Sequence, residues 1–83
     1  MDGSRDEFRR EMDKALTSLI NSIASTKIDQ DNRDLLADFV ENFEFGVALE
    51  WLHSLIVSRG IQLSSDQEDE IQRLAKRMGL DLG

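Results

Sequence analysis

Four carboxylates recur at helical spacing in the second quarter of the chain and form its strongest chemical signal. They follow one another at intervals of three, four and three residues: Asp31, Asp34, Asp38 and Glu41. At about 100° per residue they share one side of a helix, centred about 160° from the apolar face of the same segment. Because carboxylates form charge-assisted hydrogen bonds with Lys and Arg side chains, the spacing predicts an outward acidic stripe that binds a cationic partner.

The residues around this stripe add to its charge. The segment from Asp29 to Glu50 holds seven acidic residues and one base, Arg33, which gives a formal charge of −6 and brings Glu44 and Glu50 close to the stripe. A run of charge on a helix is most often a solvated face. Like charges at this spacing, however, destabilise a helix by roughly 0.2–0.5 kcal/mol per pair. The presence of the stripe despite this cost favours a role in binding. A competing acidic group opens the last predicted helix, where the helix dipole explains it: Asp66, Glu68, Asp69 and Glu70.

Three further side chains are candidates for binding or catalysis. Trp51, the single tryptophan, is either a ring packed at the edge of the core or a binding hot spot. His53, the single histidine, has no cysteine or second histidine as a partner, so we expect a surface or boundary residue. His53-Ser54-Leu55 resembles the modification site of a peptidyl carrier, although it falls in mid-helix and no Gly-Gly precedes it.

The pattern of residues does not favour catalysis or metal binding. The stretch from Asp29 to Asp34 resembles the start of a calcium loop, but Asp34 stands where that loop needs glycine and Val40 where it needs glutamate. The chain has no cysteine, which excludes a disulfide, a thiolate zinc site and a cysteine nucleophile. We therefore expect a binding protein that is not an enzyme and that needs no metal or cofactor.

These candidate residues must be positioned by helices, because apolar residues recur with helical period in four segments and nowhere alternate as in a strand. The predicted helices cover about Ser4–Ala24, Asp31–Asn42, Phe45–Arg59, and Ser64 or Ser65 up to Gly79, with a loop over Ser25–Asp29. Three pairs have capping-box spacing: Ser4 with Glu7, Ser64 with Gln67, and Ser65 with Glu68. Gly60 and Gly79 suit left-handed helix ends, with Leu80 folding back onto the last helix.

The apolar faces of these helices predict an all-α fold, a small four-helix bundle around a single core, with residues 1–83 as one domain. Those faces hold Phe8, Met12, Leu16, Leu19, Ile20 and Ile23, then Leu35, Leu36, Phe39, Val40 and Phe43, then Ala48, Leu49, Leu52, Leu55 and Ile56, and finally Ile71, Leu74, Ala75 and Met78. Val47 and Val57 widen the third face, and a helix apolar over most of its circumference is usually central. The same two valines leave the oligomeric state open, as a self-association patch or as exposed residues.

Charge limits the classes of partner. The 83 residues include 10 Lys and Arg against 17 Asp and Glu, a net charge of −7. Such a surface repels nucleic acid and acidic membranes and attracts basic proteins. No stretch approaches the roughly 20 apolar residues of a membrane span, and the acidic start differs from a signal peptide, so we expect a cytoplasmic protein.

A resemblance to a known family appears in the second half of the chain. The segment Glu44-Phe45-Gly46-Val47-Ala48-Leu49-Glu50-Trp51-Leu52 is similar to the central motif of the MafI family of immunity proteins. The link Ile61-Gln62-Leu63-Ser64 and the last helix, with Ile71, Leu74-Ala75, Met78 and Gly79-Leu80-Asp81, are similar as well. The likeness covers about Asp38–Asp81. Within the motif, Gly46 and Ala48 are small enough to let the second and third helices approach closely.

The resemblance implies a cytoplasmic immunity protein of a bacterial polymorphic toxin or contact-dependent inhibition system. Such proteins are encoded beside a secreted toxin and bind its toxic domain, and many of these toxins are nucleases with basic active sites. The expected partner is therefore a cationic toxin C-terminal domain, met by the acidic stripe together with Glu44, Glu50 and Trp51. The alternatives are a small acidic helical adaptor or regulatory protein and, less favoured, an acyl or peptidyl carrier domain.

Overall fold

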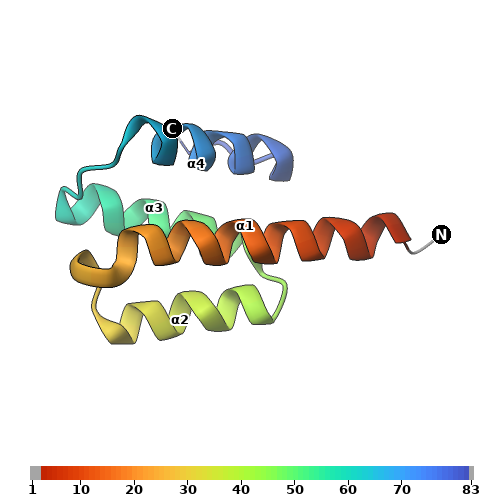
Figure 1. Ribbon diagram of the computed structural model, residues 1–83, viewed down its shortest axis with the longest axis horizontal. Helices are drawn as coiled ribbons and strands as arrows, with labels where there is room; N and C mark the ends of the chain where they lie inside the picture. Colours follow the sequence, from red (N-terminus) through yellow and green to blue (C-terminus); the bar gives the residue numbers. More distant parts are fainter. Residues whose placement is uncertain (1–2, 83) are drawn as a thin grey trace.

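Four α-helices form the fold in the computed structural model, which describes residues 3–82 apart from the side chains of residues 3, 4 and 24–26. They are α1 (Gly3–Lys27), α2 (Gln30–Glu41), α3 (Phe45–Arg59) and α4 (Ser65–Met78), with no strand in the described part (Figure 1). The helices α1, α2 and α3 pack against one another, and α4 packs on α1 and α3 on the side away from α2. The predicted all-α four-helix bundle is thus confirmed.

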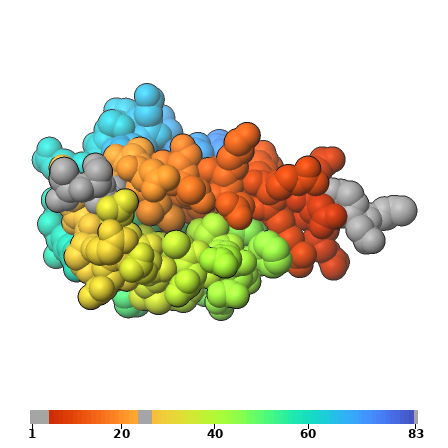
Figure 2. Space-filling view, turned by 60° about the horizontal axis from the view of Figure 1, so that its bottom comes forward, coloured from red at the N-terminus to blue at the C-terminus, as the bar shows by residue number. Residues whose placement is uncertain are grey.

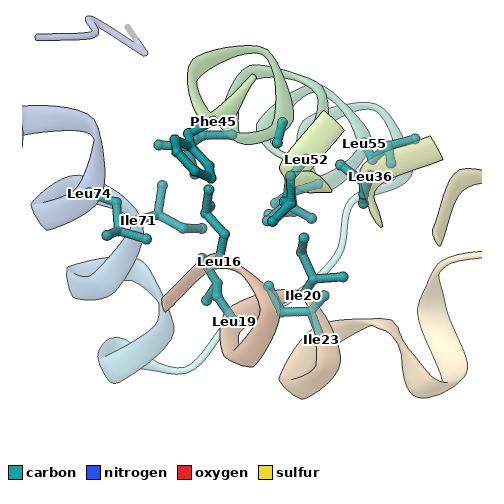
Figure 3. Packing of buried hydrophobic residues seen from close by; sticks show 14 of the residues in the cluster. Leu16, Leu19, Ile20, Ile23, Leu36, Phe45, Leu52, Leu55, Ile71 and Leu74 are labelled. Atoms are coloured by element: carbon teal, nitrogen blue, oxygen red, sulfur yellow. The ribbon is translucent and has the colours of Figure 1, made fainter. Parts of the chain in front are cut away.

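Leucine and isoleucine side chains from all four helices meet in one hydrophobic cluster. Leu16 of α1 lies near its centre, between Phe45 and Leu52 of α3 and Ile71 of α4 (Figure 3). The helix α3 supplies the most buried residues among the described ones, as its broad apolar surface predicts: Phe45, Ala48, Leu49, Leu52, Leu55 and Ile56. No polar or charged residue with a described side chain is buried. The core formed by the described side chains is therefore apolar.

The C-terminal end of α1 and the start of α2 differ from the sequence prediction. The predicted loop over Ser25–Asp29 is wrong for its first three residues, because α1 continues to Lys27 and only Ile28 and Asp29 connect the helices. Ile28 is buried, and Asp29 caps α2 by accepting the backbone N–H of Asn32 at 3.2 Å, so the turn is fixed at these two residues. The capping box predicted for Ser4 and Glu7 involves the Ser4 side chain, which lies outside the described side chains.

The start and end of α4 follow local signals that the sequence displays. Ser64 accepts the backbone N–H of Gln67 at 3.1 Å and donates its own N–H to the Gln67 side chain at 2.9 Å, which completes the predicted capping box. At the other end, Gly79 is left-handed and the Leu80 N–H donates to the Ala75 carbonyl at 2.8 Å, as predicted. Leu80 then packs on the core.

The predicted role of Gly46 in bringing α2 and α3 together is wrong. The glycine lies beside Leu80, where an added Cβ would sit 3.7 Å from the Leu80 Cδ1. That distance is an ordinary van der Waals contact, so the site tolerates a methyl group. Gly46 is thus placed against the C-terminal residues after α4. Leu80 is 34 positions away in sequence, so this neighbour does not show in the local pattern.

The predicted place of Phe43 on the apolar face of α2 is wrong, because the helix ends before this residue. The helix stops at Glu41, and Phe43 has a left-handed backbone with φ of 62°. The Glu44 N–H donates to the Phe39 carbonyl at 2.8 Å and the Phe43 N–H to the Val40 carbonyl at 3.1 Å, as in a Schellman motif. The left-handed residue turns its side chain away from the apolar face of α2, and Phe43 is 53% exposed. A non-glycine residue in this conformation costs roughly 1–2 kcal/mol.

Candidate partner-binding surface

The acidic stripe, defined as Asp31, Asp34, Asp38 and Glu41, lies on the outer side of α2. All four residues are exposed, whereas the opposite side of the helix buries Leu36 and Val40 in the core. The outer side of α2, in yellow and green, lies open beside α1 in Figure 2. The structure therefore brings the four predicted residues together on one accessible face. No basic residue occupies the last turn of α2, so nothing within that turn offsets the charge of Glu41.

Most of the stripe has no partner within the described part of the protein. Asp34 accepts a hydrogen bond from the Gln30 amide at 2.8 Å, but the carboxylates of Asp31, Asp38 and Glu41 accept no side-chain hydrogen bond and form no ion pair there. The described ion pairs lie elsewhere and join Arg59 to Asp29, Arg73 to Glu70 and Arg77 to Glu11. The stripe thus keeps its capacity to accept hydrogen bonds from the cationic groups of another molecule.

Asp29 belongs to a different arrangement. Its carboxylate accepts hydrogen bonds from the Asn32 amide at 2.9 Å and from Arg59, at the far end of α3, at 2.8 Å. These bonds hold the pKa of Asp29 well below its usual range. Adding Arg59 to the charge count changes the −6 of the segment to −5. The sequence count missed this base because it lies 30 positions away.

The hydrogen bonds to Asp29 make a testable difference between two substitutions. Asp29→Asn keeps an acceptor for the Asn32 N–H but removes the charge that pairs with Arg59. Asp29→Ala removes both the charge and the helix cap. We therefore expect the urea midpoint at neutral pH to fall further for Asp29→Ala. A lowered pKa gives stability that is present above the unfolded-state pKa of about 3.9 and lost as pH falls below it. The advantage of wild type over Asp29→Asn should therefore shrink between neutral pH and the acid range. An equal advantage at both would contradict the role of the charge.

Trp51 joins α3 to the start of the acidic stripe. Its indole N–H donates to the Asn32 side-chain oxygen at 3.0 Å, and its ring meets Phe39 edge to face at 6.5 Å between centroids. The residue is still 41% exposed. Trp51 therefore has features of both interpretations, because it packs at the edge of the core and also offers an accessible aromatic surface. Asn32 is held in turn by Asp29, so this surface has a fixed position.

Glu44 and Glu50 are both exposed, but they do not extend the stripe on α2. Glu44 stands at the N-cap of α3, where its side chain accepts no capping hydrogen bond. Glu50 precedes Trp51 and is therefore turned about 100° around the helix from the side that faces α2. It shares the outer face of α3 with Val47, which is exposed as well. The predicted site is thus divided, with the acidic stripe on α2, Glu44 at the N-cap of α3 and Glu50 on the outer face of α3.

The competing acidic group at the start of α4 is partly accounted for by internal contacts. Glu70 makes two hydrogen bonds with Arg73, at 2.9 and 2.8 Å, which lower the pKa of Glu70. Asp66, Glu68 and Asp69 are exposed in the first turns of the helix, where the dipole favours negative charge. Glu68 and Asp69 also border a surface hollow of about 750 Å³ whose lining includes Ile56 and Ile71. This group remains an alternative surface.

The residues considered for chemistry stay separate in the fold. His53 is half-buried at the edge of the same hollow, and Ser54 is exposed in the middle of α3, as the sequence predicts. Within the described residues, no group of histidine and acidic side chains is placed to hold a metal ion. The calcium-like stretch forms the cap and first turn of α2 instead of a loop. None of the helices in residues 3–82 is both long and apolar enough to cross a membrane.

Phe43 is the surface residue that the sequence reasoning missed. Its ring lies 4.5 Å from the Arg9 guanidinium and 6.0 Å from the Phe45 ring, yet more than half of the residue is exposed. The available signal was that the helical pattern stops at Asn42. Because no glycine marks the turn, the spacing of Phe43, four positions after Phe39, predicts a core residue.

Comparisons with protein-family models, with curated proteins and with solved structures found no significant match.

Proposed function

We propose that this chain is an immunity protein, which binds a cationic toxin domain of a bacterial polymorphic toxin system in the cytoplasm and neutralises it by direct contact. The observation that carries the proposal is the acidic stripe, whose carboxylates are exposed and, for Asp31, Asp38 and Glu41, without a partner in the described part of the chain. The likeness of residues 44–52 to the MafI motif supports the same reading.

The proposed mechanism is phosphate mimicry by carboxylates. A nuclease or other toxin that acts on phosphates presents Lys and Arg side chains, and the stripe meets them with charge-assisted hydrogen bonds. Charges at the rim of such a contact act mainly on the association rate, which salt reduces. Pairs that become fully desolvated act on dissociation instead. Trp51, fixed through Asn32 beside the stripe, supplies apolar area of the kind that dominates binding energy.

The experiment is protection of cells. The toxin domain encoded beside the gene for this chain is expressed under an inducible promoter, with and without the chain. We expect growth only when the chain is present. Growth arrest in both cultures, with both proteins detected, would contradict the proposal, and a neighbouring gene without a toxin domain would favour a helical adaptor.

The carrier alternative has its own direct test. Incubation with a phosphopantetheinyl transferase and coenzyme A, followed by mass spectrometry, should leave the mass unchanged, because Ser54 lies in the middle of a continuous helix and not on a loop. A mass gain that maps to Ser54 would replace the immunity proposal with a carrier function.

A further inference from the structure

Three helices of this chain end in the same way, and one of them uses an unexpected residue. The helices α2, α3 and α4 are each followed by a left-handed residue, with φ of 62°, 59° and 70°. The last two are Gly60 and Gly79, which adopt this conformation without steric cost. After α2 the residue is Phe43, for which the conformation is strained. Backbone strain of this kind is concentrated at binding and active sites.

Burial of the ring does not account for Phe43. Phe43 is 53% exposed, and its described ring contacts are the Arg9 guanidinium at 4.5 Å and Phe45 at 6.0 Å. It also borders a surface hollow of about 240 Å³ between α1 and the α2–α3 turn. A large exposed ring offers contact area at a low cost in conformational entropy, because an aromatic side chain has only two rotatable bonds. These are the properties of an anchor for another molecule.

We infer that Phe43 is an apolar anchor of the contact with the cationic toxin domain, placed at the turn that follows the acidic stripe. The inference rests on the proposed function. Its support is charge complementarity around the ring. Glu41 and Glu44 flank Phe43 in sequence, and Asp6 and Asp13 line the hollow with Arg9 and Arg10, which gives these six residues a net charge of −2.

A second copy of the chain is the less suitable occupant of this surface. Two copies meeting here would bring the same net negative groups together, and like charges in a contact disfavour association. A basic partner instead places its Lys or Arg side chains against Glu41 and Glu44. The aliphatic stem or guanidinium of such a side chain also packs on an aromatic face. The ring and the carboxylates thus recognise the same class of partner.

The test compares binding with stability in the same variants. Phe43→Gly and Phe43→Asn relieve the left-handed strain and remove the ring, so we expect the urea midpoint to stay equal to or above that of wild type. Affinity for the purified, catalytically inactive toxin domain encoded beside this chain should fall by at least about ten-fold, or about 1.4 kcal/mol. Phe43→Tyr should retain the affinity. The matched control is Val57→Ala, which removes apolar area from a residue that is 67% exposed at the other end of α3 and should leave binding unchanged.

The remaining outcomes separate this inference from the proposed function. If wild type binds the toxin domain and Phe43→Gly and Phe43→Asn bind it as tightly, Phe43 is not an anchor and the proposed immunity function is unaffected. A clear fall in their urea midpoint would make Phe43 a structural residue and overturn the inference. The inference is also overturned if size-exclusion chromatography shows that wild type self-associates, that the variants do not, and that their affinity for the toxin domain is unchanged. If wild type does not bind the toxin domain, both proposals fail.

Discussion

Replacing Asp34, Asp38 and Glu41 together by lysine is expected to abolish protection of cells that express the toxin domain. The three residues are exposed and turned away from Leu36 and Val40, so the substitutions do not touch the core. The change moves the formal net charge from −7 to −1 and turns attraction of a cationic partner into repulsion. The readout is growth after toxin induction, with expression of the variant verified.

The fold of this triple variant should be unaffected, and its stability equal or slightly higher. Lysine at position 41 lies in the last turn of α2, where the helix dipole favours a positive charge and where no base is present now. Circular dichroism and the urea midpoint check this. The matched control reverses Asp66, Glu68 and Asp69, which gives the same change in charge at α4. If the α2 variant protects as well as wild type and the α4 variant does not, although circular dichroism shows that both are folded, the contact lies on α4.

Leu52→Ala is expected to cost about 2–5 kcal/mol in the free energy of unfolding. Leu52 is 0% exposed and extends from α3 toward Ile20 of α1 (Figure 3), so the shortened side chain leaves a cavity in the hydrophobic cluster that joins the four helices. A domain of this size is stabilised by roughly 4–12 kcal/mol in total, and much of the protein should then be unfolded at growth temperature.

Urea unfolding monitored by circular dichroism measures the loss. Ser54→Ala is the control, because Ser54 lies two residues further along α3 and is exposed, and its midpoint should match that of wild type. A loss below about 1 kcal/mol for Leu52→Ala would mean that the core repacks around the cavity, contrary to the complete burial of Leu52.

Much of the fold is predictable because its signals are local. The bounds of α3, the capping box of Ser64 and Gln67, and the left-handed Gly60 and Gly79 all follow from residues within a few positions of one another. The helical period then fixes which face of each helix is buried, as for Leu52. A short chain with uninterrupted periodicity leaves few other ways to bury these faces.

The differences arise from contacts between distant residues and from one unusual turn. The Asp29–Arg59 pair, the hydrogen bond from Gln67 to Ser22 and the contact of Gly46 with Leu80 each join segments at least 30 positions apart, which a local pattern does not reveal. The turn at Phe43 lacks the glycine that marks the other two.

In the candidate site as well, some residues are predictable from local sequence and others are not. The direction of the acidic stripe follows from the helical period alone, and its four residues are exposed on one side of α2. The role of Trp51 required the structure, because its indole N–H is bonded to Asn32, 19 positions earlier. The exposure of Phe43 could not be predicted either, because a left-handed turn is normally marked by glycine and none is present there. Strain and exposure are properties of the folded chain, and only the fold displays them together.

The proposed binding of a cationic toxin domain through the acidic surface is tested by measuring the association of the two proteins in solution. Stopped-flow mixing of the purified chain with the inactive toxin domain encoded beside it gives the association rate at low and at high salt. We predict a one-to-one complex whose association rate falls steeply as salt is raised, since exposed charges more than about 10 Å apart are screened at moderate ionic strength. Absence of binding at low salt, or an association rate that salt leaves unchanged, would rule out recognition through the acidic surface.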